Sequence, residues 1–248
     1  MKVIVPDIPW GETLQEYARP LQACLDVVAP NAPGEVWLGA HHPDVDPPAD
    51  AIIYQTEVVG SSWFTPAYTA KLARARAVWD YSLCHFKKYP SQAWSHVPLR
   101  YHPCLETIEL KPVEIPIGFL GSLNGRRRAV LDGAEIMPRL FGADRDAWLA
   151  RVGVVVVPHF YPGCPVEQNR IGHLLANGIP VVAENAPDEY EYPGPKYAPA
   201  GELVGIAKVW AKSSYAFGRG LGAMGRQNYM AAGSAVREVR RALYSLRG

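Results

Sequence analysis

The sequence lacks three features that would assign it to a special class of protein. No apolar run approaches the about 18 to 20 residues that cross a bilayer. The four cysteines are scattered without a CxxC pair, which argues against a zinc ribbon or a disulfide framework and is typical of reduced thiols. The start, MKVIVPDIPW, is too short and too rich in proline for a signal-peptide core, and it favours a first strand. We therefore expect a cytoplasmic protein without a membrane partner.

The composition is that of an ordinary globular protein, with 48% hydrophobic and 20% charged residues among 248. The net charge of +1 conceals an asymmetry between segments. Residues 1–114 hold nine basic against thirteen acidic side chains, and residues 115–202 hold eight against ten. Residues 203–248 hold eight against one. This basic tail could bind an anionic partner such as DNA, although charge runs are more often solvated helix faces.

Short apolar runs alternate with segments of helical spacing. The expected strands are Lys2–Val5, Glu35–Leu38, Ala51–Tyr54, Ala77–Asp80, Val97–Leu99, Ile115–Leu120, Val152–Val157 and Pro180–Ala183. The expected helices are Leu14–Val28, Pro66–Arg76, Arg126–Gly133, Arg145–Arg151 and Val166–Asn177. Several strands are continuously apolar, as parallel strands are when helices cover both faces of their sheet. The alternation predicts an α/β protein with parallel sheets.

Residues 101–114 interrupt this alternation, because Pro103 and Pro112 stand in a stretch with little periodicity. We interpret the stretch as a crossover between two Rossmann-like domains, residues 1–112 and residues 113–248. The last helix, about residues 225–246, could return to pack on the first domain. Two such sheets would face a cleft with the carboxyl ends of their strands, where ligands of open α/β sheets bind.

A strand, a glycine loop and a basic helix start follow one another in Ile117–Arg128. Gly121 and Ser122 lie in the loop, and Arg126 and Arg127 open the helix. Glycine lets the backbone approach a ligand, a helix start offers free N–H groups, and arginine binds phosphate with two donors. The combination predicts a pyrophosphate site, with an ordinary turn and solvated arginines as the alternative. The pattern is not GxGxxG, which argues against a dinucleotide.

A second strand, loop and helix add polar residues to the same half. His159 lies in the loop after the apolar strand Val152–Val157, and Glu167, Arg170 and His173 recur every three residues on the next helix. Glu167 could accept hydrogen bonds from sugar hydroxyls, and Arg170 could hold a phosphate. The alternatives are a surface ion pair and a structural histidine.

Two carboxylates at the ends of buried strands, Glu57 and Asp80, are the candidate catalytic residues of the first half. A carboxylate in such a place can act as a base that takes the proton of a substrate hydroxyl. Each of the two also has a structural interpretation, as a turn cap or an ion-pair partner. Asp7 and Glu12 are weaker candidates for the base.

The loop HHPDVDPP holds His41, His42, Asp44 and Asp46, which are residue types that bind metals. The loop is rich in proline and has no helical or strand spacing that would fix their geometry. We therefore predict no metal site and no required cofactor.

Several segments resemble GT-B glycosyltransferases. The run VGVVVVPHFYPGCPVEQNRIGHLLANGIPVVAE is similar to their donor-binding core, in which a strand, a loop and a helix with an acidic residue precede a strand of the form small-Gly-x-Pro-Val-Val. With IPIGFLGSLNGRRRAVLDG it resembles a compact group of bacterial and phage glycosyltransferases, and IIYQTE and VWDYS have counterparts in that group. The similarity spans roughly residues 50–190 and is most specific at ANGIPVVAE.

The resemblance implies a nucleotide-sugar donor in the C-terminal half and an acceptor in the N-terminal half. The expected reaction transfers a hexose from a nucleotide diphosphate sugar, such as UDP-glucose, to a hydroxyl of a glycan or small molecule. Arg126, Arg127 and Arg170 would neutralise the diphosphate, and Glu167, together with His173, would hold donor hydroxyls.

The sequence departs from the family at one point. Many GT-B enzymes have two glutamates eight positions apart in the donor region, whereas here Glu167 is followed at that distance by Leu175. His173 is the residue nearest to the second carboxylate. The residue that contacts the donor ribose is therefore open.

Two other functions are consistent with the sequence. The basic tail and the small size suggest a phage-type DNA glucosyltransferase that acts on hydroxymethylated bases, whose DNA binding would weaken steeply with salt. The other is a non-catalytic module that binds a nucleotide or a partner.

Overall fold

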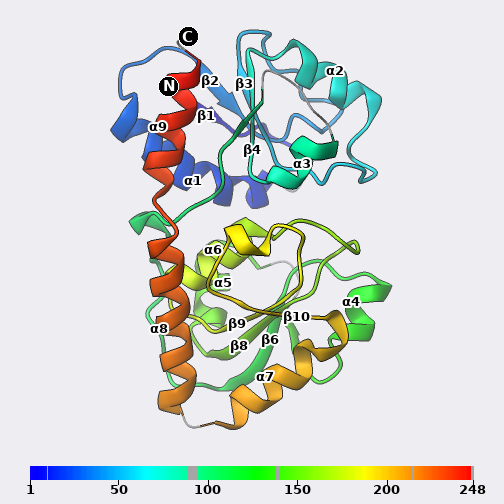
Figure 1. Ribbon diagram of the computed structural model, residues 1–248, viewed down its shortest axis with the longest axis vertical. Helices are drawn as coiled ribbons and strands as arrows, with labels where there is room; N and C mark the ends of the chain where they lie inside the picture. Colours follow the sequence, from blue (N-terminus) through cyan, green and yellow to red (C-terminus); the bar gives the residue numbers. More distant parts are fainter. Residues whose placement is uncertain (10, 89–93, 138–139, 214, 247–248) are drawn as a thin grey trace. The chain divides into compact units, whose positions relative to one another are not determined.

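A computed structural model describes residues 1–9, 11–88, 94–137, 140–213 and 215–246 (Figure 1). They form two compact units: unit 1 consists of residues 1–104 and 234–248, and unit 2 of residues 105–233. Within the described residues, each unit holds one sheet of five strands, and neighbouring strands pair in parallel. The prediction of an α/β protein with two Rossmann-like domains is confirmed.

Unit 1 has the strand order β1-β2-β3-β4-β5. Its strands are β1 (Lys2–Ile4), β2 (Glu35–Trp37), β3 (Ile52–Gln55), β4 (Ala77–Asp80) and β5 (Trp94–His96). Its helices are α1 (Gly11–Val28), α2 (Pro66–Arg74), α3 (Leu83–Lys88) and α9 (Ala235–Ser245), with a short 3₁₀ turn η1 (Pro103–Leu105) at the border with unit 2.

Strands β3 and β4 of unit 1 are buried on both faces. Tyr54 and Trp79 belong to the core on the side of α1 and α9, where Leu25 also packs. Ile53 and Val78 belong to the core on the other face, which α2 helps to cover. The continuous apolar sequence of these strands follows from this double burial.

The last strand of unit 1 lies earlier in the sequence than we predicted. The structure has β5 at Trp94–His96, whereas Val97–Leu99 has no regular structure. Pro98 has no N–H group to donate to a sheet, so the strand ends before it. The Val97 carbonyl instead accepts a hydrogen bond of 2.8 Å from the Tyr54 hydroxyl.

The C-terminal segment forms two helices instead of one over residues 225–246. α8 (Tyr215–Ala231) belongs to unit 2, and α9 belongs to unit 1. Gly233 separates them with a φ of 126°, and the Ser234 side chain then caps α9 by accepting from the Arg237 N–H. α9 packs beside α1 through Val239 and Ala242 (Figure 1), so the last helix does return to the N-terminal sheet.

The segment before the second sheet is tied to unit 2. The Asn177 side-chain oxygen, at the end of α6 (Gln168–Ala176), accepts hydrogen bonds from the backbone N–H groups of Thr107 (2.9 Å) and Ile108 (2.8 Å). Its amide nitrogen donates to the Leu105 carbonyl at 2.8 Å. Unit 2 therefore begins at Leu105, eight residues before the predicted start at residue 113.

Unit 2 has the strand order β10-β9-β8-β6-β7. Its strands are β6 (Ile115–Leu120), β7 (Glu135–Met137), β8 (Val152–Val157), β9 (Val181–Glu184) and β10 (Lys196–Ala198). Its remaining helices are α4 (Gly125–Val130), α5 (Gly142–Leu149) and α7 (Leu203–Lys212), with 3₁₀ turns η2 (Glu189–Glu191) and η3 (Ala200–Glu202). The sequence did not predict β7 and β10, because each of these three-residue strands has a charged residue and only two consecutive apolar residues, EIM and KYA, so no apolar run marks it.

Two helices of unit 2 pack closely against the sheet and its loops. Trp148 of α5 lies over Gly118 of β6, where an added Cβ atom would be 2.6 Å from the indole ring. α8 approaches the turn after α6 even more closely, because a Cβ atom at Gly222 would be 1.9 Å from the Gly178 carbonyl oxygen. Glycine at these positions permits contacts that no other residue would allow.

We expect Gly222→Ala to destabilise unit 2 by about 1–3 kcal/mol or more, because α8 must move away from backbone atoms. Gly220→Ala is a matched control on the same helix, since nothing lies within 4 Å of the place that its Cβ atom would take. Alanine there should raise the free energy of unfolding by about 0.5–1 kcal/mol, because glycine is unfavourable inside a helix. Chemical denaturation of both variants checks the difference, and equal effects would contradict this packing.

Candidate active site

The candidate donor site lies at the carboxyl edge of the sheet of unit 2. Because β6, β8 and β9 are parallel, their carboxyl ends meet at one edge. Gly121 follows β6, Pro158 and His159 follow β8, and Glu184 ends β9. The loops after β6 and β8, together with the helices α4 and α6 that follow them, carry the residues that we predicted to bind a donor.

Arg127 is the buried centre of this edge, with only 2% of its surface exposed. Its Nε donates to the Pro158 carbonyl at 3.0 Å, and its Nη1 donates to the Ser122 carbonyl at 2.9 Å. Its Nη2 forms an ion pair with Glu167. The guanidinium also lies 5.4 Å from the centre of the Phe119 ring. Because Arg127 is buried and three of its five N–H donors bind the protein, it holds the loops of this edge together and offers little accessible surface to a diphosphate.

Arg170 shares the carboxylate of Glu167 with Arg127. Its Nη1 lies 2.9 Å from Glu167 Oε2, one turn along α6. Burial raises the pKa of Glu167, but Arg170 and Arg127 outweigh it, and the net pKa lies below the ordinary value. Glu167 is therefore ionised at neutral pH between two cations, which leaves one positive charge in excess.

Gly121 leaves the space that Arg170 occupies. A Cβ atom at Gly121 would lie 2.5 Å from Arg170 Nη2, and the backbone has a φ of 138°, which side chains rarely adopt. The glycine loop thus brings the guanidinium of Arg170, whose side chain is 22% exposed, next to the backbone at the end of β6. Ser122, the next residue, is exposed, and its carbonyl accepts from Arg127.

Arg126 and His159 meet at the end of β9. Arg126 donates to the His159 carbonyl at 2.6 Å and pairs with Glu184. The other oxygen of Glu184 accepts from the His159 backbone N–H at 2.9 Å. The His159 ring donates from Nε2 to the Asn185 carbonyl at 3.3 Å.

The structure places His173 away from these contacts. Its Nε2 lies 3.0 Å from Asp146 Oδ1 on α5, and the Thr107 hydroxyl donates to the other oxygen of that carboxylate at 2.6 Å. Burial raises the pKa of Asp146, yet the bonds from His173 and Thr107 lower it well below its ordinary value. His173 thus pairs with Asp146, whereas Glu167 and Arg170 form a separate cluster.

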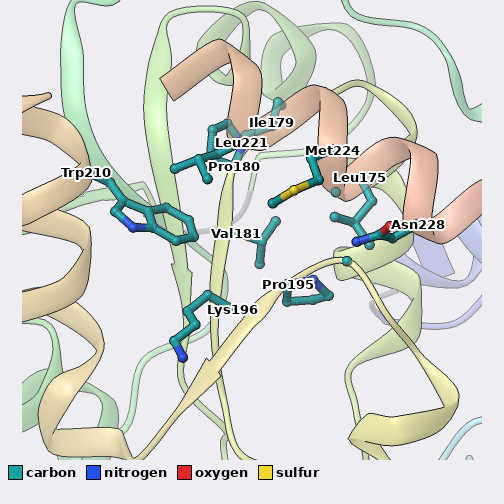
Figure 2. Close-up of a pocket in the computed structure, with 12 residues that line it drawn as sticks. Leu175, Ile179, Pro180, Val181, Pro195, Lys196, Trp210, Leu221, Met224 and Asn228 are labelled. Atoms are coloured by element: carbon teal, nitrogen blue, oxygen red, sulfur yellow. The ribbon is translucent and has the colours of Figure 1, made fainter. Parts of the chain in front are cut away.

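A small cavity of about 190 Å³ lies at the opposite end of this sheet (Figure 2). It opens where β9 and β10 begin, at Val181 and Lys196, and α8 and Trp210 of α7 contribute to its wall. Its other lining residues are Leu175, Ile179, Pro180, Gly194, Pro195, Leu221, Met224, Gly225 and Asn228. The lining is mainly apolar, so this cavity is distinct from the charged carboxyl edge.

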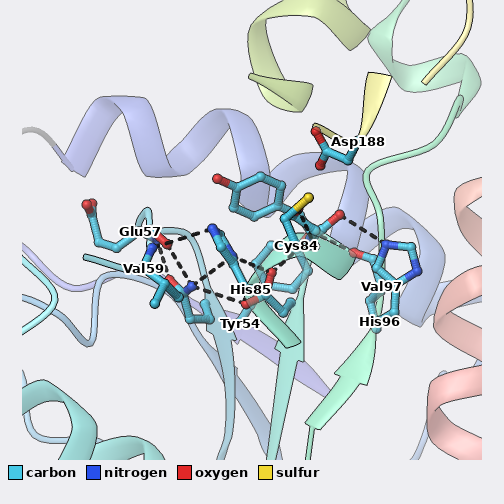
Figure 3. Close-up of polar contacts among 12 residues, drawn as sticks. Tyr54, Glu57, Val59, Cys84, His85, His96, Val97 and Asp188 are labelled. Carbon is cyan, nitrogen blue, oxygen red and sulfur yellow. Dashed lines mark hydrogen bonds and ion pairs between the residues drawn. The ribbon is translucent and has the colours of Figure 1, made fainter. Parts of the chain in front are cut away.

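In unit 1, Asp80 is the buried centre of a polar network. Figure 3 shows His85 and Glu57 of the same network. It has no exposed surface at the end of β4 and accepts from the Ser82 backbone N–H at 2.8 Å. His85 Nδ1 lies 2.9 Å from Oδ1, and the Gln55 amide donates to Oδ2 at 3.1 Å. A carboxylate so enclosed can orient His85 and Gln55, but it cannot reach an acceptor hydroxyl.

Glu57 is the accessible carboxylate of the same network, with 23% of its side chain exposed. Gln55 holds the Glu57 backbone from both sides, donating to its carbonyl at 2.7 Å and accepting from its N–H. Glu57 Oε1 lies 3.5 Å from His41 Nε2, and the Ser61 hydroxyl lies 3.5 Å from Oε2. Burial raises the pKa of Glu57, although Ser61 and His85 lower it in part.

Sequence reasoning missed the partners that hold these carboxylates. His85 lies in α3, five residues after Asp80, and was not considered as a partner of that carboxylate. Gln55 stood out only as a polar residue in an apolar strand. His41 was considered only as a metal ligand, whereas the structure places it beside Glu57. A polar residue in a buried strand was the one available signal, because such groups need partners.

Several features are not found among the residues that the structure describes. No three His, Cys, Asp or Glu side chains gather into a cluster that could hold a metal ion. None of the described helices combines the length and apolar character needed to cross a bilayer. The four cysteines are free thiols.

Solved structures of glycosyltransferases match nearly the whole chain. TarM matches 91% of it with a TM-score of 0.57 at 8% identity. AviGT4, a glycosyltransferase of avilamycin A biosynthesis, matches 99% of this chain and 92% of its own, with a TM-score of 0.56 at 11% identity. Anabaena HepE, solved with UDP and glucose, matches 100% of this chain and 78% of its own, with a TM-score of 0.55 at 11% identity. The chain has the GT-B glycosyltransferase fold.

The chain covers 58% of the TarM chain, less than two thirds of its length. No protein-family model and no curated protein matches its sequence. The resemblance to GT-B glycosyltransferases is confirmed at the level of the fold, while the likeness to a compact bacterial and phage group stays a prediction.

Proposed function

We propose that the chain transfers a hexose from a nucleotide diphosphate sugar to an acceptor hydroxyl. The observation that carries this proposal is the Gly121–Arg170–Glu167 arrangement at the carboxyl edge of unit 2. It places the guanidinium of a partly exposed arginine side chain at a glycine loop, which suits a diphosphate. The GT-B fold and the presence of UDP and glucose in the HepE structure support a nucleotide-sugar donor.

Arg170 is the residue that we assign to the diphosphate. Arg126 is paired with Glu184, and Arg127 is buried with three of its five N–H donors bound within the protein. Glu167 forms ion pairs with both Arg127 and Arg170, so an anionic ligand can pair with Arg170 while Glu167 stays paired with Arg127. In this proposal no metal is required, because the guanidinium stabilises the departing nucleoside diphosphate.

Glu57 is the residue that we assign to the acceptor hydroxyl. As the acceptor oxygen bonds to the anomeric carbon, its proton passes to Glu57, and the bond from that carbon to the phosphate oxygen breaks. The nucleoside diphosphate leaves with the electron pair of that bond. Asp80 is a positioning residue, which acts through Gln55 on the backbone of Glu57.

A DNA acceptor receives less support from the basic tail. Arg226 pairs with Glu106, and Arg219 donates to the Lys111 carbonyl. Arg237 and Arg241 both pair with Glu238 on α9. Because four of the tail's eight basic residues already have a partner within the chain, we propose a carbohydrate or another small hydroxyl compound as the acceptor.

We expect Arg170→Ala to weaken the binding of UDP-glucose by about 10- to 100-fold, as the loss of a hydrogen bond to a charged group costs about 1.5–3 kcal/mol. Isothermal titration calorimetry measures this loss. Arg128→Ala, which removes an exposed arginine on α4, is the control and should leave affinity unchanged. If neither UDP-glucose nor another nucleotide sugar binds the wild-type protein, the proposed function is wrong.

A further inference from the structure

The loop that carries His41 and His42 is wrapped around a lysine ammonium group. Lys71 Nζ, from α2, donates to the carbonyls of Ala40 (3.2 Å), His42 (2.8 Å) and Val45 (2.5 Å). An ammonium group has three protons, so these three acceptors satisfy it. The loop has no regular structure, but this contact fixes its backbone and thereby the positions of both histidines.

The two histidines hold an exposed tryptophan. The His41 ring meets the Trp63 ring edge-on, with 5.7 Å between ring centres, and the His42 ring lies near-parallel to it at 6.3 Å. Trp63 keeps 44% of its surface exposed. An indole that is fixed by neighbours yet open to solvent offers a flat apolar surface at little cost in side-chain entropy.

Polar groups that can bind hydroxyls lie beside this surface. Glu57 contacts His41 and Ser61, and the Trp63 backbone N–H donates to the Ser61 hydroxyl at 3.3 Å. His41 Nδ1 is buried and has no hydrogen-bond partner in the described part of the chain. A pyranose ring has the matching surface, since its C–H face is apolar and hydroxyls surround its rim.

The local charge favours a neutral ligand over a phosphodiester. The basic residues of α2 are both engaged, because Lys71 binds the loop carbonyls and Arg74 pairs with Asp46. Asp44 and Glu57 add negative charge near the same loop. A nucleic-acid backbone would meet carboxylates here and few available cations.

We propose that Trp63, with His41 and His42, forms the acceptor site and that the acceptor is a pyranose unit of a neutral glycan. The ring stacks on Trp63, and one hydroxyl points to Glu57. This inference rests on the proposed function and names the substrate class of its acceptor.

Saturation-transfer NMR tests the proposal with the full chain, UDP and the methyl glycosides of glucose, galactose and mannose as probes. We expect at least one glycoside to bind the wild-type protein, and Trp63→Ala to weaken it at least tenfold. Trp63→Phe should restore most of the binding, because it retains a flat ring. Tyr244→Ala, at an exposed aromatic of α9 in the same unit, is the control and should have no effect.

Two results would overturn the proposal. One is that no glycoside binds, or that Trp63→Ala binds it as well as the wild type. The other is that a duplex containing 5-hydroxymethylcytosine binds in a salt-sensitive manner and loses this binding in Trp63→Ala. UDP-glucose titration separates this failure from failure of the proposed function: if UDP-glucose still binds, only the acceptor assignment is wrong.

Discussion

Glu57→Gln is expected to lower kcat for hexose transfer by about 10²- to 10⁴-fold, the usual contribution of a general base. Glutamine keeps the shape of the side chain but cannot accept the proton of the acceptor hydroxyl. The affinity for UDP-glucose should not change, because the donor residues that we propose belong to unit 2. Steady-state kinetics and calorimetry on the same preparation measure both quantities.

Glu12→Gln is the control for this prediction, since Glu12 is an exposed carboxylate of α1 in the same unit. Its kcat should equal that of the wild type. If Glu12→Gln loses activity and Glu57→Gln keeps it, the base is assigned to the wrong residue.

The pH dependence gives a second readout for Glu57. Burial raises its pKa above the ordinary value of a glutamate, and the base works only when ionised. The rate should therefore fall as the pH falls through this raised pKa, so the acid limb of kcat/KM lies above the pH at which an exposed glutamate titrates. That limb should be absent from the residual activity of Glu57→Gln, and its persistence there would assign it to another group.

Arg127→Met is expected to destabilise unit 2 by about 3–5 kcal/mol, the usual cost of removing one partner from a buried ion pair. The change leaves the Pro158 and Ser122 carbonyls without their donor. It also leaves Glu167 with Arg170 as its remaining cation. Chemical denaturation gives the free energy of unfolding.

Arg128→Met is the matched control, because it makes the same chemical change one residue further along α4 at an exposed position. It should alter the free energy of unfolding by less than about 0.5 kcal/mol. Similar losses in the two variants would show that Arg127 is not the buried centre of this edge.

The α/β architecture was predictable because most strands are marked by a short apolar run in their own part of the sequence. Continuous apolar runs indicated strands covered on both faces, and the structure has parallel strands at nearly all of these positions. The outer strands β7 and β10 could not be found in this way, because their sequences, EIM and KYA, contain only two consecutive apolar residues each.

The donor edge was predictable in its location but not in the role of each arginine. Arg126, Arg127 and Arg128 are equivalent in the sequence, yet the turn of α4 buries the second, leaves the third exposed and pairs the first with Glu184. Only the packing of α4 against the loop that joins β8 to α6 distinguishes the three arginines.

The helix α6 was predicted correctly, but the assignment of both Glu167 and His173 to one donor site was not supported by their contacts. Glu167 and His173 are six residues apart, which corresponds to about 9 Å along a helix. His173 therefore reaches Asp146 on α5, while Glu167 at the start of the helix reaches Arg127. A shared face predicts a common ligand only over about one turn.

The most direct test of the proposed transfer reaction is the release of nucleoside diphosphate from a nucleotide sugar. The wild-type chain, incubated with UDP-glucose and the best-binding methyl glycoside, is expected to release UDP and form a disaccharide, both detectable by mass spectrometry. Arg170→Ala and Glu57→Gln should lose this turnover. If a panel of nucleotide sugars binds to the wild type and none is turned over, the chain is a non-catalytic binding module and the proposed transfer reaction is wrong.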